Sequence, residues 1–153
     1  TIAPAEVSED VAKEAHELAL RLAQGFELAG ILAIELFVTK DERVIVNELA
    51  PRPHNSGHYT IEACSFDQFD AHIRGIAGWP LEQPELLKPA VMVNVLGQHV
   101  APTRALIAEH PEWNMHDYCK AEVRHDRKMG HITVLTDDTR QTVADLERTG
   151  CWD

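Results

Sequence analysis

Glu35 and Glu48 are acidic residues in largely apolar stretches, and their spacing predicts that they face each other. Glu35 interrupts the run 30–38, and Glu48 lies in the run 44–50. The polar residues 39–43 between these runs are typical of a hairpin loop. Two strands joined in this way would present two carboxylates, whose oxygens are the ligands that Mg²⁺ prefers.

The register of this hairpin decides whether the two carboxylates share a face. A loop closed around Asp41 and Glu42 places Glu35 directly opposite Glu48, with β-carbons roughly 4.5–5.5 Å apart. Like charges in these positions are destabilising unless a cation binds between them. Asp-Glu is not a favoured two-residue turn, and a longer loop could shift the register by one and turn Glu48 to the opposite face. The alternatives to a metal or phosphate site are an ion pair between Glu35 and a distant arginine, or exposure at a sheet edge.

A polar loop follows the second glutamate directly. Segment 51–57 contains two prolines, which remove ladder donors and exclude a central strand. Arg52 offers a planar fork for phosphate or carboxylate, His54 exchanges protons near neutral pH, and Ser56 precedes a predicted helix start, where anions bind. A metal pair next to an anion-binding loop suits phosphoryl transfer. The alternative is a surface turn with solvated side chains; a zinc site at His54 and His58 lacks a nearby third ligand.

A second cluster of cations lies near the C-terminus. Lys120, Arg124, Arg127 and Lys128 fall within nine residues of a chain that is otherwise acidic. Placed beside Gly130, they could bind a substrate phosphate. A solvated hairpin tip explains the same pattern equally well.

The composition narrows the class of protein. A net charge of −11, from 25 acidic and 14 basic residues, argues against broad nucleic-acid binding. No apolar run reaches the roughly 20 residues of a membrane span, and no signal-peptide pattern is present. The cysteines Cys64, Cys119 and Cys151 lack CxxC spacing, which favours free thiols in a reducing compartment. We therefore expect a cytoplasmic protein that binds neither membrane nor nucleic acid.

Helices and strands are predicted on both sides of these clusters. Ser8 is a favoured N-cap followed by two acids, and apolar residues recur at helical spacing as far as Gly25. Two prolines within 81–89 mark the best linker. Further helices are predicted at 58–64, 66–76, 103–109 and after Asp138, with strands at 90–96, 113–122 and 131–136.

These elements predict an α+β fold in two parts. The first part, 1–84, would be a mainly antiparallel sheet flanked by helices. The second part, 85–153, would be a small β-rich domain.

The run 47–60, Asn-Glu-Leu-Ala-Pro-Arg-Pro-His-Asn-Ser-Gly-His-Tyr-Thr, is the most specific motif in the chain. It resembles the 5-(carboxyamino)imidazole ribonucleotide synthases, ATP-grasp enzymes of purine biosynthesis also known as the ATPase subunit of phosphoribosylaminoimidazole carboxylase. The likeness is to their C-terminal part and covers nearly the whole chain. It also includes the segments 35–38, 69–74, 91–97 and 127–131.

The resemblance implies a fold and a reaction. Residues 1–84 would be the second half of an ATP-grasp domain, and 85–153 a small C-terminal domain. The reaction would be the ATP-dependent carboxylation of 5-aminoimidazole ribonucleotide with bicarbonate. ATP would convert bicarbonate to carboxyphosphate, and the substrate amine would capture the carboxyl group or released CO₂.

The resemblance also assigns roles by position. Glu35 and Glu48 would hold Mg²⁺ on the ATP phosphates, with Asn47 and Glu48 beside the nucleotide. Arg52 and His54 would contact bicarbonate or carboxyphosphate as the catalytic pair. The ribonucleotide would be bound by residues of both predicted domains: Asn55, Ser56, Lys120, Arg127 and Lys128.

One departure from the family affects the expected activity. The family has an N-terminal substrate-binding domain and a glycine-containing ATP lid with lysines, and neither precedes Glu35 here. We therefore expect an incomplete C-terminal fragment, inactive without the missing N-terminal half, from an enzyme that forms a homodimer. Two alternatives stay open: another ATP-grasp ligase that acts on bicarbonate or a carboxylate, and a non-catalytic dimerisation or docking module.

Overall fold

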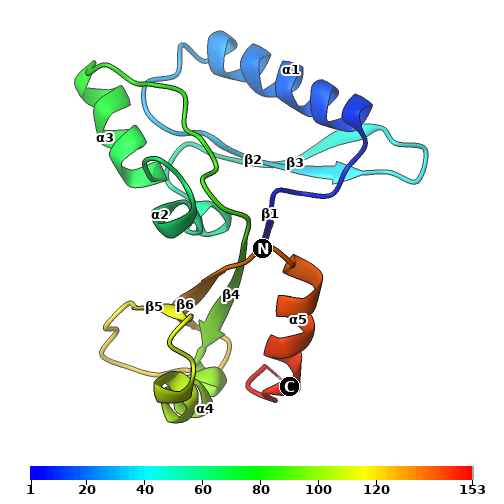
Figure 1. Cartoon of the computed structure of the whole chain (residues 1–153). Helices are drawn as coiled ribbons and strands as arrows, with labels where there is room; N and C mark the ends of the chain where they lie inside the picture. Colours follow the sequence, from blue (N-terminus) through cyan, green and yellow to red (C-terminus); the bar gives the residue numbers. More distant parts are fainter. Residues whose placement is uncertain (153) are drawn as a thin grey trace. The chain divides into compact units, whose positions relative to one another are not determined.

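The computed structural model describes residues 1–152, and their contacts divide the chain into two compact units (Figure 1). The hairpin unit comprises Ala5–Ile61 and Phe66–Glu85. The sheet unit comprises Thr1–Pro4, Glu62–Ser65 and the chain from Leu86 onward. The domain boundary suggested at residues 84 and 85 stays a proposal.

The hairpin unit begins with the predicted amphipathic helix. Helix α1 (Glu9–Gly25) starts after Ser8, whose side chain accepts a hydrogen bond from the Val11 amide at 3.4 Å. The helix lies along the hairpin of β2 (Ala33–Val38) and β3 (Val44–Ala50), as Figure 1 shows. Both the helix and the hairpin are confirmed.

The loop of this hairpin differs from the prediction. Thr39 and Arg43 form the last pair, with 3.0 Å from the Thr39 amide to the Arg43 carbonyl, so the loop contains three residues and not Asp41-Glu42 alone. Glu42 has a left-handed backbone, φ 58°. A turn followed by one left-handed residue is the usual three-residue hairpin loop. The predicted two-residue closure is therefore wrong.

Two short helices follow the hairpin along the chain. Helix α2 (Thr60–Ala63) is shorter than the predicted 58–64 and follows the 3₁₀ turn η1 (Asn55–Gly57). Helix α3 (Gln68–Ala77) is capped by Asp67, whose carboxylate accepts from the amides of Phe69 and Asp70. This side-chain cap explains why α3 starts two residues later than predicted.

The sheet unit contains a four-stranded antiparallel sheet in the order β1-β4-β6-β5. The strands are β1 (Ile2–Ala3), β4 (Ala90–Leu96), β5 (Asn114–Asp117) and β6 (Lys128–Leu135). β1 was not predicted, because two residues carry no periodic pattern and only pairing with β4 defines the strand. β5 is shorter than the predicted 113–122, since Cys119 has a left-handed backbone, φ 52°.

The buried core lies in the sheet unit. Two helices and two 3₁₀ turns complete this unit: η2 (Gly97–His99), α4 (Val100–Leu106), η3 (Ile107–Glu109) and α5 (Thr139–Arg148). Asp138 caps α5 as predicted. The core residues are Val91, Val95, Val100, Trp113, Met129, Ile132, Val134, Leu146 and Cys151. The α+β fold class is confirmed, and no helix of residues 1–152 is long and apolar enough to cross a bilayer.

Candidate functional site

Glu35 and Glu48 are cross-strand partners, as predicted, but a β-bulge produces the pairing. Near the loop Leu36 pairs with Val46, whereas the next pair is Glu35 with Glu48. Asn47 is thus the extra residue of β3 between these two pairs. A bulge lets two residues oppose one on the partner strand. Without it, the three-residue loop would put Asn47 opposite Glu35 and turn Glu48 to the other face.

The surroundings of the two carboxylates leave them available to a cation. The Asn47 amide donates to Glu35 Oε2 at 3.2 Å. His54 Nε2 lies 3.6 Å from Glu35 Oε1. Among residues 1–152, no lysine or arginine forms an ion pair with either glutamate. Two adjacent acids without a lysine or arginine partner fit Mg²⁺, which takes carboxylate oxygens as ligands.

His54 faces this carboxylate pair from the proline-rich loop. Its Nδ1 lies 2.8 Å from Ser56 Oγ and accepts from the Ser56 amide at 3.4 Å. Because Nδ1 accepts, the proton of the neutral ring lies on Nε2, the atom nearer Glu35. His54 is only 17% exposed, so the loop buries the ring while directing one N–H toward the acids.

Gln68 positions His54, and sequence reasoning missed it. The buried Gln68 side chain accepts from the His54 amide at 2.9 Å and donates to the His54 carbonyl at 2.9 Å. Its amide nitrogen also lies 2.8 Å from His58 Nδ1. A side-chain amide here replaces the strand partner that the two prolines exclude. A glutamine in the first turn of a helix carries no sequence signal for this role; only the fold brings the two segments together.

Gly57 is required by the same contact. A β-carbon on Gly57 would lie 2.6 Å from Gln68 Oε1, closer than real β-carbons approach. The small residue thus lets the His54 loop lie against α3. Figure 1 shows this loop between β3 and α3.

The remaining loop residues are near the acids in sequence but point to other partners. Arg52 is exposed, and its guanidinium donates to the Pro53 carbonyl at 3.1 Å. Asn55 opens the 3₁₀ turn η1 next to Ser56. The structure therefore brings together Glu35, Asn47, Glu48, His54 and Ser56, whereas Arg52 is held by the carbonyl of Pro53.

The second cationic cluster belongs to the sheet unit, in the loop between β5 and β6 and at the start of β6. Lys120 Nζ donates to the Lys128 carbonyl at 2.5 Å and lies 5.4 Å from the centre of the Tyr118 ring. Arg127 donates to the Glu122 carbonyl at 3.2 Å, and Arg124 pairs with the Glu122 carboxylate. These contacts fold the loop back on itself, and three of the four cations are exposed.

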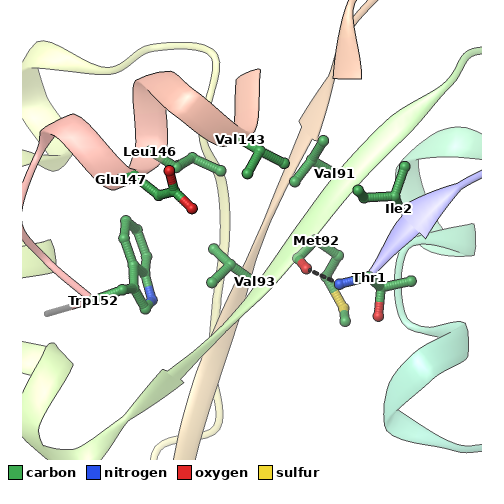
Figure 2. A pocket seen from close by; sticks show the side chains of 9 residues that line it. All are labelled: Thr1, Ile2, Val91, Met92, Val93, Val143, Leu146, Glu147 and Trp152. Atoms are coloured by element: carbon green, nitrogen blue, oxygen red, sulfur yellow. Dashed lines mark hydrogen bonds between the residues drawn. The ribbon is translucent and has the colours of Figure 1, made fainter. Parts of the chain in front are cut away.

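An apolar groove in the sheet unit differs in character from these polar loops. A groove of about 350 Å³ lies between β1, β4 and α5, and Figure 2 shows its lining. Val91, Val93, Val143 and Leu146 line it, together with the charged side chain of Glu147. The Thr1 amino group donates to the Met92 carbonyl at 2.7 Å at its rim. An apolar groove of this kind does not suit phosphate binding.

Comparisons with known proteins relate both parts of the chain to one enzyme family. The ATP-grasp domain family matches residues 1–69, and the phosphoribosylaminoimidazole carboxylase C-terminal domain family matches residues 90–145. An N5-carboxyaminoimidazole ribonucleotide synthase from Staphylococcus saprophyticus is 46% identical over 143 residues, which are 93% of this chain and 38% of that protein.

Solved structures show the same relationship. The ADP complex of an N5-carboxyaminoimidazole ribonucleotide synthetase is 43% identical, with a TM-score of 0.96 over 99% of this chain and 40% of the other. An Aspergillus clavatus synthase in complex with ADP and 5-aminoimidazole ribonucleotide is 34% identical, with a TM-score of 0.87 over 97% and 42%. The chain thus spans about two-fifths of the length of these proteins. By sequence and by fold, these 153 residues are a relative of the N5-carboxyaminoimidazole ribonucleotide synthases and match the C-terminal part of those ATP-grasp proteins.

Proposed function

We propose that this chain is the metal- and anion-binding part of an N5-carboxyaminoimidazole ribonucleotide synthase. The whole protein would carboxylate the amine of 5-aminoimidazole ribonucleotide, with ATP and bicarbonate as co-substrates. The observation that carries the proposal is the pairing of Glu35 with Glu48 on one face, with His54 Nε2 at 3.6 Å from the first. The related solved structures with ADP and with 5-aminoimidazole ribonucleotide support it.

The reaction has two balanced steps. An oxygen of bicarbonate attacks the γ-phosphorus of ATP, and ADP leaves with the bridging electron pair to give carboxyphosphate. The substrate amine then attacks the carboxyl carbon and expels inorganic phosphate, or carboxyphosphate first dissociates to CO₂ and inorganic phosphate and the amine attacks the CO₂. In either case the C–N bond forms as the amine loses a proton, which the released phosphate can accept. Both steps bring anions together, so the site must neutralise negative charge.

The acidic pair, through a bound Mg²⁺, and the His54 loop would each neutralise part of this negative charge. Glu35 and Glu48 would hold Mg²⁺, which supplies positive charge to the nucleotide phosphates. Asn47 orients Glu35 through its amide and would contact the nucleotide. The Nε2–H of His54, set by Ser56, would donate to bicarbonate or carboxyphosphate. Arg52 would leave the Pro53 carbonyl to bind the same anion, since its contact there is exposed and weak.

The remaining polar residues would bind the ribonucleotide. Asn55 and Ser56 would contact it from the His54 loop. Half-buried Lys120 and exposed Arg127 and Lys128 would bind its phosphate, because a loop rich in lysine and arginine is a favourable anion site in an acidic protein.

We further propose that residues beyond these 153 complete the site. The hairpin unit has only a two-stranded sheet, which is marginally stable alone. Its outer half also exposes Phe37, Val38, Ile45 and Val46. The N-terminal half of the protein or a second subunit of a homodimer would cover this surface. The free cysteines Cys64, Cys119 and Cys151 support a cytoplasmic location.

A chimera tests the proposed function. The 153 residues replace the matching part of the S. saprophyticus synthase, and release of ADP is followed with and without aminoimidazole ribonucleotide and bicarbonate. We expect turnover that depends on both substrates, and none from the 153 residues alone. His54→Ala should reduce the rate by a factor of 10² or more, whereas His16→Ala on the exposed side of α1 should not. A folded chimera without substrate-dependent turnover would overturn the proposal and favour a docking module.

A further inference from the structure

A second group of metal-ligand side chains lies in the sheet unit, and the proposed reaction uses none of them. His116 of β5 and His131 of β6 are direct cross-strand partners. Their rings lie parallel, with centres 4.6 Å apart and 12° between the planes. Glu62, also of the sheet unit, meets them: its Oε1 lies 2.5 Å from His116 Nε2.

The three side chains are withdrawn from water to different degrees. His131 is 2% exposed, and the Glu62 and His116 side chains are 14% and 36% exposed. The second carboxylate oxygen of Glu62, Oε2, is buried, and no hydrogen-bond donor among residues 1–152 reaches it. A buried acceptor without a donor costs free energy, which a bound cation would offset.

The distances suit a single small cation. One ligand atom from each residue lies within 4.8 Å of the other two. Zinc binds imidazole nitrogen and carboxylate oxygen at roughly 2.0–2.2 Å, which puts ligands in a tetrahedron about 3.4 Å apart. Small side-chain rotations, without movement of the strands, would close the remaining gap.

Tyr118 supports one ring in the way that metal sites commonly do. Its hydroxyl lies 2.9 Å from His131 Nδ1. With the Nδ1 proton donated to this oxygen, Nε2 keeps its lone pair for a metal. A ligating histidine usually uses its second nitrogen in such a hydrogen bond.

We propose that Glu62, His116 and His131 bind one divalent transition-metal ion, with Zn²⁺ as the best match to two imidazoles and one carboxylate. The fourth position would be open to water or to another ligand. The ion would tie Glu62 to strands β5 and β6, so that binding stabilises the sheet unit. This inference is independent of the proposed carboxylation. A simple ion pair between Glu62 and His116 would explain their short contact, but it would involve neither His131 nor Glu62 Oε2.

Titration of the untagged, chelator-treated chain with Co²⁺ and Zn²⁺ tests the site. We expect one equivalent of Co²⁺ to give the visible absorption of a tetrahedral site, and Zn²⁺ to displace it. His116→Ala and Glu62→Gln should weaken binding at least tenfold, and Tyr118→Phe about tenfold. Far-UV circular dichroism verifies that each variant is folded, and Glu62→Gln preserves shape if an alanine variant does not fold.

His125→Ala is the matched control. His125 forms an exposed pair with Asp126, Nδ1 to Oδ2 3.2 Å, without a third ligand. His125→Ala should leave the affinity for Co²⁺ and Zn²⁺ unchanged. No stoichiometric binding, or binding that folded Glu62→Gln retains in full, would overturn the proposal and leave only the ion pair.

Discussion

Glu35 and Glu48 lie directly opposite each other because Asn47 is a bulge residue in β3. The three-residue loop shifts the hairpin register by one, and the bulge shifts it back before the acids are reached. The same residue donates its side-chain amide to Glu35. The bulge thus performs two tasks: it brings the second carboxylate to the shared face and orients the first.

Replacing Glu48 with glutamine separates a metal-binding role from a structural one. Removal of one of two adjacent like charges should leave the free energy of unfolding of the chain unchanged or raise it by up to about 1 kcal/mol. In the chimera the same change should reduce nucleotide turnover by a factor of about 10² or more. Urea unfolding and ADP release measure the two effects.

The hairpin loop supplies the control for this prediction. Glu42→Gln changes an exposed acid away from the pair and should alter turnover little. Marked destabilisation by Glu48→Gln would instead assign Glu48 to the support of the fold.

Gln68 is expected to act on His54 without contacting a substrate. Gln68→Ala would leave the His54 amide and carbonyl without their partners, at a cost of about 1–3 kcal/mol in the free energy of unfolding. In the chimera we expect a lower kcat with a raised KM for bicarbonate and an unchanged KM for ATP. Gln24→Ala, at the end of α1, is the control, and equal changes in both KM values would contradict a role specific to His54.

Gly97 permits the basic loop to lie against the end of β4. A β-carbon there would collide with the Arg124 carbonyl, so Gly97→Ala should displace the loop and cost about 1–3 kcal/mol. Gly25→Ala meets no atom within 4 Å and should stabilise α1 by roughly 0.5–1 kcal/mol. Thermal unfolding should give a lower melting temperature for Gly97→Ala than for Gly25→Ala. Similar melting temperatures would contradict the close contact at Gly97.

Neutralising Arg127 and Lys128 together tests the phosphate site. Both side chains are exposed, so alanine at the two positions should leave the fold intact. In the chimera the KM for the ribonucleotide should rise about tenfold or more, with KM for ATP unchanged. Arg148→Ala with Lys13→Ala removes two surface cations elsewhere and serves as the control. An unaltered KM for the ribonucleotide would show that these cations form a solvated loop without a role in substrate binding.

Asp117 provides a prediction about pH. The side-chain hydrogen bond from Arg104, at 2.7 Å, and the Cys119 amide lower the pKa of Asp117 from its usual value. A lowered pKa stabilises the fold at pH values above the ordinary pKa of an aspartate, and this contribution disappears as pH falls through the lowered value. Arg104→Ala should raise the pKa of Asp117 toward the ordinary value, as NMR titration of the carboxyl carbon would show.

The Cys119 amide makes this prediction sharper. Because that N–H bond remains in Arg104→Ala, the pKa should stay somewhat below the ordinary value. Arg148→Ala removes the partner of Asp145 and should leave Asp117 unaffected. An unchanged titration of Asp117 in Arg104→Ala would show that the ion pair does not form in solution.

Local sequence determined most helices and strands of this protein. Ser8, Asp138 and the alternation of 131–136 each act through neighbours in the chain, so their pattern predicts the element directly. The chemistry of Glu35, Glu48 and His54 could be proposed for the same reason, since residue type and spacing define it.

Only the tertiary structure decided how these residues meet. The two-residue strand β1 exists through pairing with β4, and Gln68 reaches His54 across 14 positions of the chain. The group Glu62, His116 and His131 joins segments up to 69 residues apart in sequence, as the difference between positions 62 and 131 shows. Contacts of this kind depend on packing between distant segments, which the local pattern of a sequence does not encode. The pairing of the two glutamates lies between these cases: the spacing suggested it, but an unpredicted loop and an unpredicted bulge produced it together.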